Sequence, residues 1–512
     1  MANFVPSVQQ AAFFNWIDSG SGSAMLEAVA GSGKTTTLLQ ALPRTSGTVA
    51  FVAFGKKIAE EIKARIARDN LDPQNRITAS TVHALGLQIY RNHYPRAKVD
   101  DKKLWNLATA TPDGKDQLIP MHSIAFAMRA VNMAKQAGIG ATIDASDRDA
   151  WYRLVDHYSL DQYLSEENGT TLEDALRYAC ILLKASNDCT NAIDFNDMIY
   201  LPVRMKLASK FRYDWIFLDE CQDTNAMRLE LISRVSHENT RVVAVGDSRQ
   251  AIFGFAGADS DSVAAITKRF NCVSLPLTVS YRCPQAVVRE AQQWVSHIQA
   301  HETAPEGQVS HCDMTTFWDN IFPTLGAEDF VICRNTAPIV KLAYAMLAKG
   351  KACMVEGRDI GTGLVKLATK WKRVKTIAAL RAKVEEWRSR EMERAEKKGN
   401  DSRKASVIDQ AECLLIIMAQ FADDDKVERV RDSIQAMFGD TPEGARPIVL
   451  TLSTIHKSKG REARRVLWLG RNAYNPSRYA RKDWEMLQEA NLMYVAATRA
   501  KETLIYVNVD AD

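Results

Sequence analysis

Short apolar runs alternate with helical patterns along much of the chain, and both kinds of segment recur in the same order. The apolar runs lack the polar alternation of a half-exposed strand, so they are expected to be strands buried on both faces. In the first half these runs span residues 24–29, 49–54, 215–219 and 241–246. The helical patterns among them span 34–42, 56–67 and 225–236. Alternation of this kind predicts a parallel sheet with helices on its faces.

The same alternation returns in the second half. Strands are expected near 272–275, 329–334, 447–453, 464–470 and 503–508, and helices near 284–297, 336–348 and 484–500. Each α/β pattern is interrupted once by a helical stretch, at 83–190 and at 357–446. We therefore predict an α/β fold with two parallel-sheet domains, each carrying a helical insertion.

The two insertions differ in how their apolar residues are arranged. In the first, the expected core positions are Trp105, Ile124, Phe126 and Met128. In the second, a narrow apolar stripe at spacings of three and four residues follows a highly charged helix, and it consists of Ile377, Leu380, Val384 and Trp387. The apolar block 405–421 is the expected packing partner of this stripe.

Composition and charge refine this picture. The chain has 512 residues, of which 46% are hydrophobic and 25% charged, an ordinary globular composition for about three or four domains. The 66 Lys and Arg against 62 Asp and Glu give a net charge of +4, which by itself indicates no polyanionic partner. Residues 365–404, however, hold 14 Lys and Arg against 6 Asp and Glu, whereas residues 141–200 hold 4 against 12. The basic segment is either a surface that meets a polyanion or a solvated helix face.

The nine cysteines are dispersed and form no CxxC pair, which disfavours zinc ribbons and favours reduced thiols in the cytosol. His297 and His301 are four residues apart, but no Glu follows the first and no third ligand is apparent, so we interpret them as a helix surface. The longest apolar runs, such as Cys413–Ala419, have seven residues, and the N-terminus lacks the features of a signal peptide. A soluble, cytoplasmic protein without a membrane span is expected.

A glycine-rich stretch from Ala28 to Thr36, between the first strand and the next helix, has the features of a phosphate-binding loop. Glycines let backbone N–H groups wrap phosphates, and the helix N-terminus adds positive potential. Lys34 is expected to reach the β- and γ-phosphates, and the Thr35 hydroxyl to hold Mg²⁺.

A carboxylate cluster follows a second buried strand, in the sequence Leu-Asp-Glu-Cys-Gln-Asp from Leu218 to Asp223. Ligands of open α/β sheets bind at the carboxyl ends of the strands, so this cluster and the glycine-rich loop are expected at one edge. Asp219 is expected to hold the Mg²⁺ of a nucleotide, and Glu220 to orient and deprotonate an attacking water. Together the two segments predict nucleotide hydrolysis.

With these two segments in place, further stretches in chain order complete a set that resembles the motor motifs of superfamily 1 helicases of the UvrD/Rep/PcrA type. The resemblance runs from about residue 5 to about residue 507. The segments that carry it are 5–9, the AxxGxGKT loop at 28–35, 53–57 with Glu61, 81–83, DECQDTN at 219–225, 246–258, Tyr281-Arg282, 454–462 and 494–500.

This resemblance implies two RecA-like domains that bind ATP and Mg²⁺. It places Gln9 and Tyr281 on adenine and Glu462 near the ribose and phosphates. The loop residues around the phosphates would be Ala30, Gly31, Ser32, Gly33, Lys34, Thr35 and Thr36. Gln250 would sense the γ-phosphate, while Arg282 and Arg499 would act as arginine fingers on the transition-state charge.

The resemblance also implies a nucleic-acid site. Single strands are bound by aromatic stacking together with backbone charge. Phe54 and Phe255 are the candidates for base contact, with His83 and His456 nearby. The expected partners are single-stranded DNA and junctions of single and double strands, with movement 3′→5′. An RNA substrate is an alternative, because phosphate contacts and stacking do not distinguish the sugars. Protein partners and the pathway (repair, replication or recombination) stay open.

The resemblance also predicts the domain boundaries. The first RecA-like domain would comprise 1–82 and 191–276 around an insertion at 83–190, and the second 277–356 and 447–512 around an insertion at 357–446. The second insertion would be reduced, and a C-terminal nuclease domain would have no room.

Three positions depart from the family pattern. Ala256 and Thr36 stand where arginines are common, and Ser280 stands where asparagine is common. The first two bear on the strength of coupling and on nucleotide affinity. Two alternative functions remain open at this point: a translocase that strips proteins from single strands with little unwinding, and a nucleic-acid-binding module with weak ATPase. The intact set of expected catalytic residues disfavours the binding module.

Overall fold

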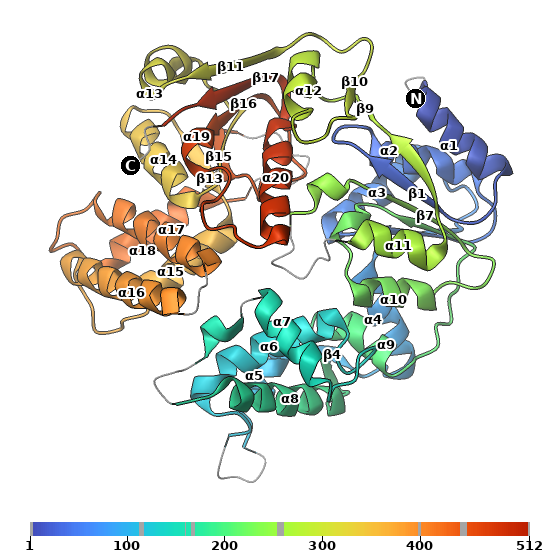
Figure 1. Cartoon of the computed structure of the whole chain (residues 1–512), viewed down its shortest axis with the longest axis horizontal. Helices are drawn as coiled ribbons and strands as arrows, with labels where there is room; N and C mark the ends of the chain where they lie inside the picture. The colour runs from blue at the N-terminus through green and yellow to red at the C-terminus, as the bar shows by residue number, and fades with distance from the viewer. Residues whose placement is uncertain are drawn as a thin grey trace. The chain divides into compact units, whose positions relative to one another are not determined.

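The computed structural model describes residues 4–111, 117–158, 160–164, 169–252, 261–397, 401–440 and 448–509. The chain divides into two compact units, which Figure 1 shows along the colour gradient. The first comprises Met1–Ala28 and Gly33–Leu277, and the second comprises Val29–Ser32 and Thr278–Asp512. Each unit is built on one large parallel sheet.

The first sheet has six strands in the order β3-β2-β6-β7-β1-β8, and every neighbouring pair is parallel. The strands are β1 (Ala24–Ala28), β2 (Val49–Ala53), β3 (Ile77–Thr81), β6 (Trp215–Leu218), β7 (Arg241–Gly246) and β8 (Val273–Leu277). Parallel neighbours need crossover connections, which helices usually supply. Here the helices are α2 (Lys34–Ala41), α3 (Lys56–Arg68), α4 (Val82–His93), α10 (Ala226–Arg234) and α11 (Ser262–Phe270).

Successive residues of these strands face two different cores. In β2, Phe51 packs into the core that contains side chains of α1 (Val8–Ser19), α2 and α3, whereas Ala50 and Val52 pack into the core that contains side chains of α4, α10 and α11. Since both faces are covered, the strands need no polar alternation, which explains their continuous apolar runs.

A group of helices interrupts the first sheet: α5 (Lys103–Ala108), α6 (Ile124–Ala137), α7 (Arg148–Tyr158) and α8 (Leu172–Asp188), followed by α9 (Asp197–Arg204) (Figure 1). Ile124 and Phe126 are buried as predicted, and Met128 packs against the same core. The prediction for Trp105 is wrong, because its side chain is 45% exposed. The short helix α5 buries Leu104 and Ala108 on one face and presents Trp105 on another.

Buried ion pairs hold this helical group to α9. The ammonium of Lys103 lies 2.6 Å from Asp197, and that of Lys135 lies 2.6 Å from both Asp194 and Asp197. These side chains are at most 9% exposed. A two-stranded ladder of β4 (Lys98–Val99) and β5 (Ala192–Ile193) lies in the same part of the chain.

The second sheet has seven strands in the order β11-β17-β16-β12-β15-β13-β14, again all parallel. The strands are β11 (Gln308–Cys312), β12 (Asp329–Cys333), β13 (Cys353–Glu356), β14 (Phe438–Gly439), β15 (Leu450–Thr454), β16 (Ala463–Leu469) and β17 (Ala500–Val507). Its accompanying helices include α12 (Gln285–Ala291), α13 (Met314–Thr316), α14 (Thr336–Ala348), α19 (Arg471–Tyr474) and α20 (Asp483–Ala497). A separate short pair joins β9 (Val279–Ser280) and β10 (Gln299–Ala300).

The second helical group comprises α15 (Arg358–Ala368), α16 (Ile377–Lys397), α17 (Asp401–Met418) and α18 (Val427–Met437). The apolar stripe of α16 is buried, with Trp387 only 5% exposed, and it shares a core with α17 residues such as Leu414 and Ile417. The predicted packing of the stripe on the block 405–421 is therefore confirmed. The predicted fold class, an α/β chain with two RecA-like parallel-sheet domains, is confirmed as well.

Two local predictions need correction. The helix expected near 284–297 ends at Ala291, and the chain then turns so that Val295 and Ile298 are buried. As a result His297 lies in an exposed turn and His301 follows β10, so the two histidines share no helix surface.

Among the described helices, none combines the length and the apolar character needed to cross a bilayer.

Candidate functional site

The carboxyl ends of five strands of the first sheet carry the predicted site residues. The phosphate-binding loop follows β1, Phe54 follows β2, and His83 comes just after β3. Asp219 and Glu220 follow β6, and a short turn ending at Gln250 follows β7. Because parallel strands all end at the same edge, the fold collects these side chains along one side of the sheet.

The glycine-rich loop takes backbone conformations that favour glycine. Gly31 and Gly33 have φ angles of 74° and 77°, where a residue with a Cβ is strained. Lys34 is the first residue of α2 and is almost buried, at 9% exposure. Thr36, at one of the positions that depart from the family pattern, accepts a hydrogen bond of 3.1 Å from the guanidinium of Arg65 in α3. Ala30 and Ser32 complete the loop as buried residues.

The loop and the carboxylates after β6 meet directly. The Thr35 hydroxyl donates to Asp219 Oδ2 at 2.6 Å, and the Lys34 ammonium lies 3.7 Å from Glu220 Oε1. Burial, reinforced by the neighbouring charge of Glu220, raises the pKa of Asp219 to about 6. A buried carboxylate beside a hydroxyl is a pair of oxygen ligands suited to Mg²⁺, and a bound cation would favour the ionised form of Asp219.

Glu220 is held in an unusual conformation at the end of β6. Its φ angle is 49°, in the left-handed region that residues other than glycine rarely adopt. Its carboxylate accepts a hydrogen bond of 2.5 Å from Gln222 Nε2. The backbone bend and the side-chain bond together fix the direction in which the carboxylate points. Local strain of this kind concentrates at functional sites.

A chain of hydrogen bonds continues from Glu220 to the end of β7. Gln222 donates to Glu220 and accepts, through Oε1, a bond of 3.1 Å from the Asp247 backbone N–H. Asp247 Oδ2 in turn accepts a bond of 2.6 Å from Gln250 Nε2. Glu220 and Gln250 are therefore linked by hydrogen bonds through two buried residues, Gln222 and Asp247.

The N-terminal helix α1 reaches the phosphate-loop helix through Gln10. Its side chain donates a 2.8 Å hydrogen bond to the Thr37 hydroxyl, and its backbone N–H donates to Ser7 in a capping box. Gln9, the residue predicted to contact adenine, is half-buried in the first turn of the same helix. Gln9 therefore lies in the helix that contacts α2 through Gln10. The contact of Gln9 with adenine stays a prediction.

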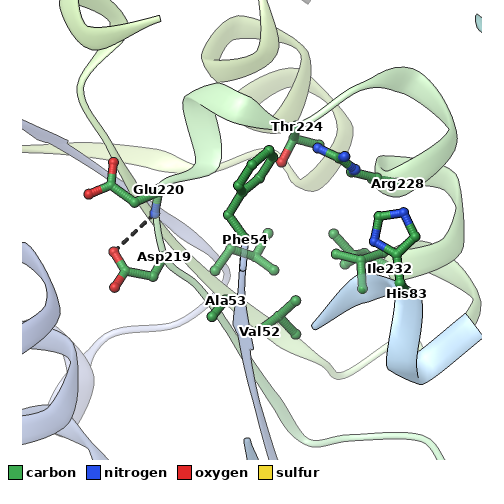
Figure 2. Close-up of a pocket in the computed structure, with 11 residues that line it drawn as sticks. Val52, Ala53, Phe54, His83, Asp219, Glu220, Thr224, Arg228 and Ile232 are labelled. Carbon is green, nitrogen blue, oxygen red and sulfur yellow. Dashed lines mark hydrogen bonds between the residues drawn. The ribbon is translucent and has the colours of Figure 1, made fainter. Parts of the chain in front are cut away.

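On the other side of the carboxylates lies a pocket of about 330 Å³, part of it open to solvent. Figure 2 shows the Phe54 ring between the two carboxylates on one side and Arg228 and His83 on the other. Phe54 is 38% exposed, and the Arg228 guanidinium lies 4.6 Å from the centre of its ring. Burial, aided by the charge of Arg228, lowers the pKa of His83 to about 3, so its ring is neutral.

Sequence reasoning missed two residues of this pocket region, Phe195 and Arg228. The Phe195 ring stacks on His83 with centroids 3.8 Å apart, yet Phe195 is 59% exposed. The sequence feature that could have indicated Phe195 is its apolar side chain between two polar residues, Asp194 and Asn196, just before α9. Arg228 lies in the first turn of α10, where no pattern in the sequence sets it apart.

The predicted residues of the second unit form their own cluster. Arg282 Nε lies 2.5 Å from Glu462, which also pairs with Lys501. Arg499 is 1% exposed and donates to the carbonyls of Val495 and Arg461, while burial lowers its pKa to about 10.

Two further predicted residues of the second unit lie outside this cluster of charges. Tyr281 is 43% exposed, with its ring 4.8 Å from that of His301. His456 follows β15, and burial lowers its pKa to about 3. Phe255, predicted to contact a base, and Ala256 lie outside the described residues.

Comparison with known proteins gives the family of this chain. The family model described as "UvrD/REP helicase N-terminal domain" matches residues 9–271, just over half of the sequence. The matched region contains the phosphate loop, the carboxylates after β6 and the pocket around Phe54. The chain belongs to the UvrD/REP helicase family.

Individual relatives are similar over the same proportion of the chain. The ATP-dependent DNA helicase Rep of Escherichia coli K12 is 27% identical over 315 residues, which cover 56% of this chain and 42% of the relative. The Rep helicase of Buchnera aphidicola from Acyrthosiphon pisum is 24% identical, with coverage of 55% and 44%. DNA helicase IV of E. coli K12 is 27% identical, with coverage of 49% and 42%. The matched part of the chain thus spans less than half the length of these relatives.

Proposed function

We propose that this protein is an ATP-dependent DNA helicase or translocase that moves along single-stranded DNA and separates duplex. The proposal rests on two side chains that the phosphate-binding loop and the pocket of Phe54 have in common. Asp219 and Glu220 contact Thr35 and Lys34 of the phosphate loop and also line the pocket of Phe54. A nucleotide-hydrolysing site and an aromatic site for a strand would therefore touch the same two side chains. The names of the relatives, Rep and DNA helicase IV, agree with this function.

On the nucleotide side, each proposed role follows from position. Backbone N–H groups of 30–36 and the Lys34 ammonium would hold the phosphates, and Thr35 with Asp219 would hold Mg²⁺, which supplies positive charge to the phosphoryl oxygens. Glu220 would take the proton of the attacking water. Gln250 would report the γ-phosphate through its bonded partner Asp247.

Residues of the second unit would complete the nucleotide site. Arg282 and Arg499 would supply the positive charge that stabilises the transition state, with Tyr281 and Glu462 on the base and ribose side. Gln9 would contact adenine from the first unit. In the described cluster the Arg282 guanidinium is held by Glu462, which restricts its orientation.

On the strand side, we propose that Phe54, His83, Phe255 and His456 contact single-stranded DNA near a junction with duplex. The partly exposed ring of Phe54 offers a flat surface for a base, and stacking of this kind is tolerant of sequence. His83, which is 8% exposed and stacked on Phe195, would contact the strand beside it. The resemblance to the UvrD/Rep/PcrA type supports a 3′→5′ direction. It also supports RecA-like domains at 1–82 with 191–276 and at 277–356 with 447–512, around insertions at 83–190 and 357–446.

The test is strand displacement on duplexes that carry a 3′ or a 5′ single-stranded tail. Each substrate is assayed with ATP, without ATP and with Mg²⁺ chelated. The proposal expects displacement from the 3′-tailed substrate only, dependent on ATP and Mg²⁺. Displacement from the 5′-tailed substrate alone would overturn the direction. Stimulated ATPase with protein stripping but no displacement would replace the helicase by a translocase.

A further inference from the structure

The pocket beside the nucleotide site contains one half-buried arginine, Arg228, whose charge the neighbouring Asp223 carboxylate compensates only in part. Burial lowers the pKa of its guanidinium. Nη1 donates to the backbone carbonyl of Asp223 at 2.6 Å. The charge of the buried Asp223 carboxylate stabilises the guanidinium, but burial outweighs it, since the pKa of Arg228 stays lowered. Burying a cation whose charge is only partly compensated costs free energy, so the position suits a further anion from outside the chain.

The surroundings of Arg228 favour one kind of anion. Its guanidinium lies against the Phe54 ring on one side, in the pocket that His83 also lines. Arg228 also borders a second pocket of about 230 Å³, part of it open to solvent, whose lining includes Gln136, Asn196 and Asn225. Arg228 and His83 are thus shared by an aromatic pocket and an amide-lined pocket.

The other charges of the two pockets are already paired. Asp219 and Glu220 interact with Thr35 and Lys34, and in Figure 2 the Phe54 ring stands between them and Arg228. Lys135, which lines the amide pocket, is bound by two buried carboxylates. With His83 neutral, the positive charge that a ligand can meet in these pockets is that of Arg228, which Asp223 offsets only in part.

We propose that Arg228 binds a backbone phosphate of the single strand, between a base held against Phe54 and the next nucleotide at the amide-lined pocket. This inference rests on the proposed function and adds the residue that would hold the strand by its phosphate. A planar guanidinium donates to phosphate oxygens through two N–H groups, while its face stays on the aromatic ring. The contact therefore fixes the spacing of the backbone relative to the stacked base.

The salt dependence of DNA binding tests this proposal. Each phosphate neutralised on a single strand contributes roughly 0.7 to the slope of log affinity against log salt. Binding of a fluorescent oligothymidine, without nucleotide, is measured by anisotropy at four salt concentrations for the wild type, Arg228→Gln and Arg228→Lys. The slope should fall by about 0.7 in Arg228→Gln and stay at the wild-type value in Arg228→Lys. When the salt concentration rises fourfold, the affinity of the wild type should fall by a factor that is about 2.6 times larger than the factor for Arg228→Gln.

The matched control is Arg177→Gln. Arg177 also lies over an aromatic ring, that of Tyr178 at 5.3 Å, but it is 63% exposed on α8 and pairs with Asp174. Its slope should equal that of the wild type. If Arg228→Gln melts at a lower temperature, Arg228→Met, which keeps the apolar stem, replaces it.

Two outcomes would overturn the proposal, and they are distinguishable. A wild type that binds single strands, with an unchanged slope in the charge-removing variants at Arg228, would leave Arg228 a packing residue and the proposed function intact. A wild type that binds no single-stranded DNA would remove the proposed function and this inference together.

Discussion

Replacing Glu220 by Gln changes one oxygen of the proposed catalytic base into an NH₂ group and leaves the shape of the side chain almost unaltered. The remaining carbonyl oxygen can still accept the bond that Gln222 now donates to Glu220 at 2.5 Å. The left-handed backbone at this position is kept, since Gln tolerates it about as well as Glu. The hydrogen bond between Thr35 and Asp219 is not touched.

The expected loss follows from the role assigned to the carboxylate. A positioned general base contributes roughly 10²–10⁴-fold to the rate, which is about 3–5 kcal/mol at about 1.36 kcal/mol per tenfold. ATP affinity should change far less. Loss of the Glu220 charge also removes one cause of the raised pKa of Asp219, so the proposed Mg²⁺ ligand ionises more readily.

The assay is ATP turnover at saturating ATP and Mg²⁺ with single-stranded DNA present, together with equilibrium binding of a fluorescent ATP analogue. Glu230→Gln is the matched control, because Glu230 is a partly exposed carboxylate on α10 that pairs with Arg234 and Arg269. Turnover within about threefold of the wild type in Glu220→Gln, far below the range expected for a general base, would refute the assigned role.

Three further predictions concern other parts of the molecule. Arg282→Ala should slow hydrolysis at saturating ATP about 10³-fold or more, while ATP affinity falls much less. Weaker ATP binding with unchanged turnover would make Arg282 a ground-state contact. Arg499 is a poorer probe, because it also donates hydrogen bonds to backbone carbonyls. Asp197→Ala should cost about 3–5 kcal/mol in the free energy of unfolding, because two buried lysines lose a carboxylate, and Asp174→Ala in an exposed pair should cost far less; equal losses in urea denaturation would contradict the buried network. The folded state disfavours protonated His83, so the stability that its neutral form contributes is lost as pH falls from 6.5 towards 3. The free energy of unfolding should fall by about 1–2 kcal/mol between pH 6.5 and 5. An NMR titration in which the His83 ring becomes charged near pH 6.5 would show this prediction to be wrong.

The sheets were predictable from the sequence because their strands are buried on both faces. Continuous apolar runs gave β1, β2, β6 and β7 to within one residue at each end. Among the strands of the two large sheets, β3, β11, β13 and β14 were not predicted. The strands β3 and β11 lie at the edges of their sheets and carry polar residues such as Thr78 and Ser310, while β13 and β14 have only four and two residues. An edge strand is half-exposed, so its pattern is weaker.

The site was predictable where local sequence determines local geometry. A strand, a glycine turn and a helix place Lys34 and Thr35 without help from distant parts of the chain. Phe195 and Arg228 could not be found in this way, because they reach His83 and Phe54 from segments more than 100 residues away. Trp105 was assigned to the core from its residue type, but the face of α5 that is buried depends on how the whole helical group packs.

In the proposed function, the site of hydrolysis and the site of strand binding have Asp219 and Glu220 in common, so a bound strand should change the rate of hydrolysis. This coupling is measured as the ratio of ATP turnover with saturating oligothymidine to turnover without it, in the wild type and in Phe54→Ala. A ring stacked on a base is worth roughly 1–3 kcal/mol. We expect a ratio well above one for the wild type and a ratio close to one for Phe54→Ala. A wild-type ratio of one, or the same stimulation in both proteins at saturating DNA, would show that strand binding at Phe54 is not coupled to hydrolysis.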